Sequence, residues 1–152
     1  MFSSCWRRLT RCCHTRYLHA VEYKDTTAFV PNIKYAKVIK VYDGDTITVA
    51  ARLLKHDDTV YRFSVRLRSI DAPEIKGQTP HECAQALVAR DALKALIYGQ
   101  IVELRNNGKE KYGRLLADIF LLDGLHVNTW LLANNYAVRY DGKGPKRDWS
   151  EA

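Results

Sequence analysis

Runs of residues that alternate between apolar and polar most constrain what this chain can fold into. Residues 46–53 (TITVAARL) and 59–68 (TVYRFSVRLR) each place apolar side chains at every second position. This is the period of a half-buried β-strand, whose successive side chains point to opposite faces. A third run, YAKVIKVY at 35–42, is rich in β-branched and aromatic residues. We therefore expect three consecutive strands joined by turns, the last of which carries arginines on its polar face.

The second half of the chain mixes helix and strand. Residues 81–99 are rich in alanine and leucine, which favours a helix that Gly99 ends. The apolar stripe of this helix is predicted to consist of Ala84, Val88, Ala92, Ala95 and Leu96. Four further elements are expected: strands at 100–105 and 114–122 around a turn in NNGKEKYG, a short helix at 127–135 and an extended stretch at 136–140.

These elements do not alternate regularly between strand and helix, as those of a parallel sheet would. We therefore predict a mainly β fold of the α+β class, a five-stranded antiparallel barrel packed by two helices. The barrel domain is expected at 26–142, between an N-terminal arm at 1–25 and a short C-terminal tail at 143–152.

Charge is concentrated in the N-terminal arm. The whole chain of 152 residues has a net charge of +7, which favours a polyanionic partner. Residues 1–20 contain four arginines, no acidic residue and three of the four cysteines, which argues against a disulfide framework for the domain. Such a segment is typical of an organelle-targeting presequence, mitochondrial ones included. A membrane-surface arm acylated at cysteine and a plain basic arm are alternatives that the sequence leaves open. No apolar run is long enough to cross a bilayer.

Two acidic segments border the predicted strands. Asp-Gly is an ordinary turn dipeptide, so Asp43 and Asp45 of DGDTITV by themselves indicate only a turn. The segment RLRSIDAPE, however, runs from the arginine-bearing strand directly into Asp71 and Glu74. If both segments meet at one edge of the barrel, Asp45 and Asp71 repel each other unless a cation lies between them. Carboxylate oxygens suit a hard divalent ion such as calcium, and no histidine or cysteine cluster competes for that role.

A third segment, EKYGR at 110–114, contributes basic and aromatic residues at the start of another strand. Arginine suits phosphate because its planar guanidinium donates paired hydrogen bonds and stays charged. Arg66 and Arg114, together with a cation, would surround one phosphate.

In this order, DGDTITV, RLRSIDAPE and KYGRLLADIF resemble the staphylococcal-nuclease-like (thermonuclease) family over roughly residues 35–140. The resemblance implies an OB-fold barrel and a calcium ion bound by Asp45 and Asp71. It also gives the backbone carbonyl of Ala72 as a further ligand, Asp43 an outer or supporting role, and Glu74 the place of the proposed general base. Relative to that family, a C-terminal third helix is expected to be missing.

The same resemblance makes Arg66 and Arg114 the catalytic arginines that bind phosphate. It places Lys111, Tyr112 and Tyr140 beside the nucleotide, and it gives Asn128 a structural role. The function it implies is calcium-dependent hydrolysis of phosphodiester bonds in DNA and RNA by in-line attack of water, with single strands preferred and 3′-phosphate ends left. We expect a monomer.

Two other functions fit the sequence as well. An OB-type barrel can bind single-stranded nucleic acid through a basic groove and stacking aromatic residues without any chemistry. The basic, cysteine-rich arm would suit an assembly or anchoring protein. The presence of Asp45, Asp71, Glu74, Arg66 and Arg114 together favours the enzyme.

Overall fold

The computed structural model describes residue 15 and residues 18–54 and 58–149. Most of the expected arm at 1–25 lies outside the described residues, and the interpretations of its function stay open. The described elements are η1 (Tyr23–Asp25), β1 (Tyr35–Val41), β2 (Thr46–Arg52), β3 (Val60–Leu67), β4 (Ile70–Asp71), α2 (Pro80–Ile97), β5 (Ile101–Lys109), β6 (Leu115–Leu121), α3 (Val127–Ala133) and β7 (Val138–Arg139). Within the described part of the chain, no helix is long and apolar enough to span a membrane.

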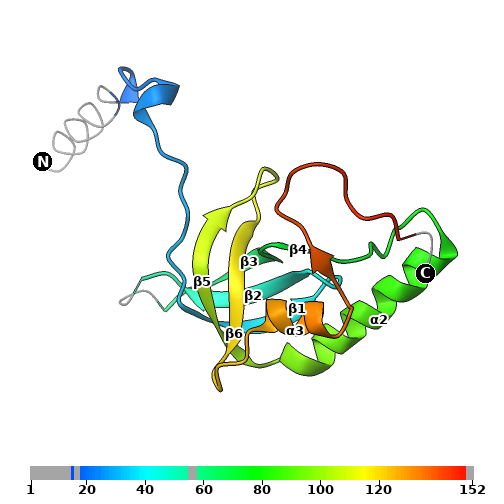
Figure 1. Ribbon diagram of the computed structural model, residues 1–152. Coiled ribbons are helices and arrows are strands. Elements are labelled where there is room, and N and C mark those ends of the chain that lie inside the picture. Colours follow the sequence, from blue (N-terminus) through cyan, green and yellow to red (C-terminus); the bar gives the residue numbers. More distant parts are fainter. Residues whose placement is uncertain (1–14, 16–17, 55–57, 150–152) are drawn as a thin grey trace, which may run out of the picture.

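Five strands close into a barrel in the order β1-β2-β3-β6-β5, which confirms the predicted barrel (Figure 1). The pairs β1–β2, β2–β3, β5–β6 and β1–β5 are antiparallel, as expected. The pair β3–β6, however, is parallel. A parallel pair needs a long connection, and here the chain passes through β4, α2 and β5 before it reaches β6.

The alternating pattern of the first strands sets the core of the barrel. Ile47 and Val49 of β2 and Val65 and Leu67 of β3 are fully buried, as the period-two pattern predicts. At the other end of the same hairpin, Val60 is largely exposed. The buried half of β3 therefore lies beside the end of the barrel at which the acidic segments meet.

Helix α2 packs across the barrel with a face that differs from the predicted one. Its start is fixed by Thr79, whose side chain accepts a hydrogen bond from the amide of Glu82, and Gly99 with φ of 78° follows its end. The predicted stripe is wrong, since Ala84 is exposed and Val88 is 58% exposed. The buried residues of the helix are Ala86, Ala89, Leu93 and Ile97. Small apolar residues occur all round this helix, so its sequence gives no single preferred face.

The glycine of the DGD turn lies directly against α2. A Cβ atom at Gly44 would lie 2.7 Å from the Cβ of Ala72 and 3.0 Å from that of Ala89. Gly44 is not among the glycines with positive φ, so it is required here for close approach and not for an unusual backbone angle. The Asp43 carboxylate accepts a hydrogen bond from the Asp45 amide at 3.1 Å, as turn aspartates commonly do.

The segment NNGKEKYG is only partly a turn. Strand β5 continues through its first half to Lys109 and has a register shift between Arg105 and Gly108 in its pairing with β6. Asn106 has a positive φ of 54° at this bulge. Asparagine and glycine, which usually indicate a turn, here form a bulged strand, and the turn is shorter than predicted.

Candidate active site

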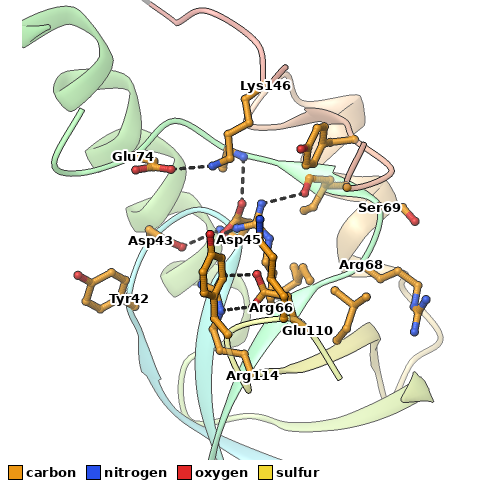
Figure 2. A pocket seen from close by; sticks show the side chains of 18 of the residues that line it. Tyr42, Asp43, Asp45, Arg66, Arg68, Ser69, Glu74, Glu110, Arg114 and Lys146 are labelled. Atoms are coloured by element: carbon orange, nitrogen blue, oxygen red, sulfur yellow. Dashed lines mark hydrogen bonds and ion pairs between the residues drawn. The ribbon is translucent and has the colours of Figure 1, made fainter. Parts of the chain in front are cut away.

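A cavity of about 680 Å³ opens where the DGD turn, β3, the β5–β6 turn and the segment after β7 meet (Figure 2). Nine of the ten predicted site residues line it: Asp43, Asp45, Arg66, Ala72, Glu74, Lys111, Tyr112, Arg114 and Tyr140. The tenth, Asp71, is almost fully buried at 1% exposure and contacts the cavity residues through its carboxylate. The structure therefore brings the three motifs of the sequence to one place.

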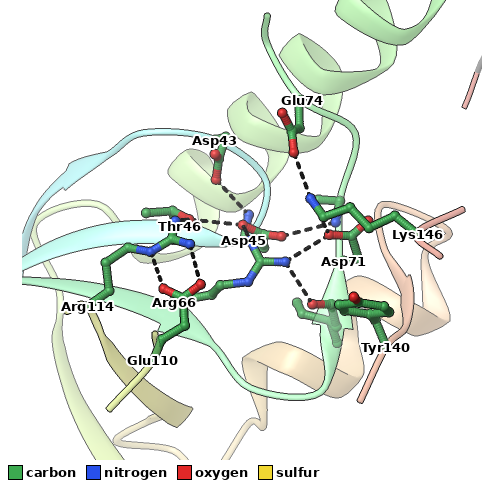
Figure 3. A network of polar contacts seen from close by, with 12 residues as sticks. Asp43, Asp45, Thr46, Arg66, Asp71, Glu74, Glu110, Arg114, Tyr140 and Lys146 are labelled. Atoms are coloured by element: carbon green, nitrogen blue, oxygen red, sulfur yellow. Dashed lines mark hydrogen bonds and ion pairs between the residues drawn. The ribbon is translucent and has the colours of Figure 1, made fainter. Parts of the chain in front are cut away.

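Arg66 of β3 joins the two predicted metal ligands. Its Nη1 donates to Oδ1 of Asp45 at 2.6 Å, and its Nη2 donates to Oδ1 of Asp71 at 2.8 Å (Figure 3). Register explains the first contact, because Arg66 pairs with Thr46 across β2 and β3, next to Asp45. The sequence predicted a divalent ion between the two carboxylates, and in the structure the guanidinium of Arg66 contacts both of them.

Asp45 is the most perturbed acid of the described residues. One of its oxygens accepts hydrogen bonds from Arg66 and from the Thr46 hydroxyl, and the other accepts one from the Ala72 amide at 3.1 Å. Burial nevertheless raises the pKa of Asp45 from 3.8 to about 7, against the opposing effect of Arg66 and with a further contribution from the charge of Asp43. Removal of the Asp45 carboxylate from water therefore outweighs the stabilisation that its hydrogen bonds and Arg66 provide.

Glu74 lies at the cavity mouth and is paired with a lysine that the sequence did not indicate. The Nζ atom of Lys146 is 2.6 Å from Oε1 of Glu74 and 3.2 Å from Oδ1 of Asp71. The hydrogen bond and the charge of Lys146 lower the pKa of Glu74. Lys146 lies far from Asp71 in the sequence, in a glycine- and proline-containing tail without periodicity. The sequence therefore gives no signal that pairs Lys146 with the site.

Arg114, at the start of β6, is held by a different carboxylate. Its Nε and Nη2 donate to the two oxygens of Glu110 at 2.6 and 2.8 Å, and its Nη1 donates to the Thr46 hydroxyl at 3.3 Å. The hydrogen bond with Arg114 lowers the pKa of Glu110. Thr46 links this group to Asp45, so both arginines belong to one polar network (Figure 3). In the sequence, the opposite charges of Glu110 and Arg114, four residues apart, are the feature that could have indicated this ion pair.

The residues predicted to flank a nucleotide lie on the rim of the cavity. Tyr112 is 73% exposed in the β5–β6 turn, and the Lys111 ammonium lies over its ring at 4.8 Å. Tyr140 follows β7 and donates from its hydroxyl to the Gly144 carbonyl at 3.2 Å. Tyr42, half exposed after β1, also lines the cavity and was not predicted. Aromatic rings therefore border the polar centre from three segments of the chain.

Asn128 of α3 connects two of the strands that carry the site. It is buried, its Oδ1 accepts from the Ile119 amide at 3.0 Å, and its Nδ2 donates to the Arg68 carbonyl at 2.9 Å. These bonds fix β6 and the end of β3 to α3. On the other side, β4 pairs with β7 so that Asp71 lies opposite Val138. The structural role implied for Asn128 agrees with these contacts.

Several oxygens of the carboxylates already have hydrogen-bond or ion-pair partners, which a hard cation would share or replace. Among the described residues, no three histidine, cysteine, aspartate or glutamate side chains form a group that could hold a metal ion. Both oxygens of Asp45 are engaged by hydrogen-bond donors, and Asp71 is engaged by Arg66 and Lys146. The donor set still fits calcium in kind, because carboxylate and carbonyl oxygens are the ligands it prefers. The raised pKa of Asp45 also indicates a place that favours added positive charge.

The chain is similar to proteins of known family. The model of the family described as staphylococcal nuclease homologue matches residues 64–151. An uncharacterized endonuclease of Escherichia coli is 30% identical over 107 residues, which are 70% of this chain and 61% of that protein. An uncharacterized endonuclease of Haemophilus influenzae is 37% identical over 84 residues, 55% of this chain and 40% of that protein. Endonuclease YhcR of Bacillus subtilis is 31% identical over 112 residues, 68% of this chain but only 9% of its own length. The chain thus spans about three fifths, or less, of these relatives.

Proposed function

The chain belongs to the staphylococcal nuclease homologues, and from this membership and the cavity we propose that it hydrolyses phosphodiester bonds of DNA and RNA with calcium. The observation that carries the proposal is the junction of Asp45, Arg66 and Asp71, with Arg114 and Glu74 in the same cavity. The relatives of Escherichia coli, Haemophilus influenzae and Bacillus subtilis are endonucleases by name, which supports nucleic acid as the substrate class.

Arg66 and Arg114 are proposed to bind the phosphate oxygens. Negative charge grows on these oxygens during in-line attack, so fixed positive groups stabilise the transition state more than the ground state. The contacts of Arg66 with Asp45 and Asp71 and of Arg114 with Glu110 hold both guanidinium groups in fixed orientations. A guanidinium has five N–H donors, so each can keep its carboxylate partner and still donate to a phosphate.

Asp45, Asp71 and the carbonyl of Ala72 are proposed to hold the calcium ion, with Asp43 in support. When bound, the ion neutralises the carboxylates and polarises the attacked phosphate. Glu74 is proposed to take the proton of the attacking water. The lowered pKa of Glu74 keeps this carboxylate ionised at neutral pH, as a proton acceptor must be. The products would carry 3′-phosphate ends.

Lys111, Tyr112 and Tyr140 are proposed to contact the nucleotide. Tyr112 is largely exposed, and the face of an exposed tyrosine ring can stack on an unpaired base. A base in a duplex is already stacked, so this arrangement favours single-stranded substrate. The proposed enzyme acts as a monomer.

The test is cleavage of a plasmid, single-stranded DNA and RNA with calcium, with magnesium or with chelator. We expect calcium to support turnover and magnesium to do so poorly, since magnesium requires tight octahedral geometry and loses its waters reluctantly. Arg66→Lys keeps the charge but loses the paired donors, so turnover should fall roughly a hundredfold while substrate binding weakens much less. Arg62→Lys, an exposed position on the same strand, is the matched control and should change neither.

The alternative of a binding module predicts a different result. The unmutated protein would then cleave nothing with any divalent ion, and its affinity for single strands would depend on salt and on Tyr112 but not on Asp45 or Glu74. Full activity in magnesium and none in calcium would instead contradict the proposed cation.

A further inference from the structure

The segment 141–149, here called the strap, follows β7 and ends beside the start of α2 (Figure 1), and part of it lines the cavity. Residues 141–148 are exposed, whereas Trp149 is buried at 7% exposure. The Trp149 carbonyl lies 3.3 Å from Nδ1 of His81 on α2, and the Arg147 guanidinium lies 4.6 Å from the centre of the Trp149 ring. At its other end the strap continues from β7, which pairs with β4, and the Tyr140 amide donates to the Ser69 carbonyl at 3.1 Å. The strap thus lies between two anchored segments, and its residues 141–148 are exposed.

Lys146 is the residue of the strap that enters the site (Figure 2). Its ammonium contacts Oε1 of Glu74 at 2.6 Å and Oδ1 of Asp71 at 3.2 Å. The Asp71 side chain is 2% exposed and that of Lys146 is 44% exposed, so a partly exposed cation is paired with a buried carboxylate. Arg66 approaches the same Oδ1 atom from the barrel side. One carboxylate oxygen therefore has two cationic partners already.

We propose that Lys146 is an internal competitor of the divalent cation, which must displace it from Asp71 and Glu74 in order to bind. The inference rests on the proposed function, because that function assigns Asp71 to the cation and Glu74 to the water. An ammonium 3.2 Å from Oδ1 of Asp71 and a divalent ion on the same carboxylate would repel each other strongly in this poorly solvated place. The exposed strap lets Lys146 leave without disturbing the barrel core. The strength of the Lys146 contacts would then set the calcium concentration at which the site fills.

The experiment is calcium titration by calorimetry in the absence of substrate, at constant ionic strength. Lys146→Met should bind calcium roughly tenfold more tightly than the unmutated protein, because a close, partly buried positive charge is removed. Lys143→Met is the matched control: it removes the same charge from the same segment, and the structure gives the Lys143 ammonium no ion pair with a described residue. Its affinity should change less than about twofold, since an exposed charge is screened. Lys146→Arg keeps the charge and should stay near the unmutated affinity.

A second readout needs no variant. If calcium releases Lys146, trypsin should cleave the unmutated protein after Lys143 or Lys146 faster with calcium than with chelator. A synthetic peptide of residues 141–149 controls for the effect of calcium on the protease itself. Cleavage that calcium leaves unchanged or slows would contradict displacement of the strap, even if Lys146→Met fails to fold.

The outcomes separate this inference from the proposed function. Equal calcium affinity of Lys146→Met and Lys143→Met, or weaker binding by Lys146→Met, would overturn the competition and leave the proposed calcium site intact. Absence of calcium binding in the unmutated protein and in both variants would overturn the site and the competition together. Tighter binding confined to Lys146→Met supports both.

Discussion

The burial of Asp45 should give the cation-free protein an unusual dependence of stability on pH. The pKa of Asp45 is about 7 in the folded protein, compared with an ordinary value of 3.8 that applies to the unfolded chain. Between these values the folded protein holds a proton that the unfolded chain has lost, so the free energy of unfolding falls as pH rises. The stabilising contribution is complete below about pH 4 and is lost by about pH 7. A carboxyl whose pKa is lowered on folding, such as Glu74, has the opposite effect.

Asp45→Asn tests this directly, because asparagine cannot ionise and its amide oxygen can still accept the hydrogen bond from the Ala72 amide. A shift of about three pH units corresponds to at most roughly 4 kcal/mol of stability. We expect the unmutated protein to lose at least about 1 kcal/mol more stability than Asp45→Asn between about pH 5 and pH 8.

The assay is urea unfolding in chelator at several pH values for both proteins. Asp91→Asn, which removes an exposed carboxylate of α2, is the control and should follow the unmutated profile. Calcium, where it binds, should stabilise the unmutated protein most at the high end of the range, where Asp45 is charged. If Asp45→Asn and the unmutated protein lose the same stability between pH 5 and pH 8, burial does not raise the pKa of Asp45 and this prediction is wrong.

Two further predictions concern the domain. Asn128→Ala leaves the Ile119 amide and the Arg68 carbonyl without their buried partner. In urea titrations it should therefore lower the free energy of unfolding by about 2 kcal/mol or more. A loss below about 0.5 kcal/mol would contradict a structural role. A chain that starts near Thr26 should cleave short single-stranded DNA as the whole chain does, because every proposed site residue follows it; loss of cleavage would show that the domain begins earlier.

Much of the fold could be predicted because its signals are local. The alternation in β2 and β3 reports the two faces of a strand directly, and Ile47, Val49, Val65 and Leu67 are buried as it requires. The helix expected at 81–99 is found at Pro80–Ile97, and Gly99 follows its end as predicted. The strand edges suggested that Asp45 and Asp71 could meet, but the roles of the motif residues came from the resemblance, since these residues lie in segments far apart in the chain.

Other features depend on contacts that the local sequence does not encode. The alanine-rich α2 could pack through any of several faces. The face with Ala86 and Ala89 is buried because it packs against the barrel, where Gly44 closely approaches Ala89. The parallel pairing of β3 with β6 arises from barrel closure, and Asn106 lies in a strand because a bulge accommodates its positive φ.

The order of the residues sets which acidic and basic side chains are available for a site, whereas packing between distant segments sets how these side chains pair. Arg66 was expected to face a phosphate and is held between Asp45 and Asp71, and Arg114 is held by Glu110. Lys146 reaches Asp71 and Glu74 because the strap runs from β7, which pairs with β4, to the start of α2. The physical reason is that the energy of a charge pair depends on distance and burial, and both are set by packing between segments far apart in the chain.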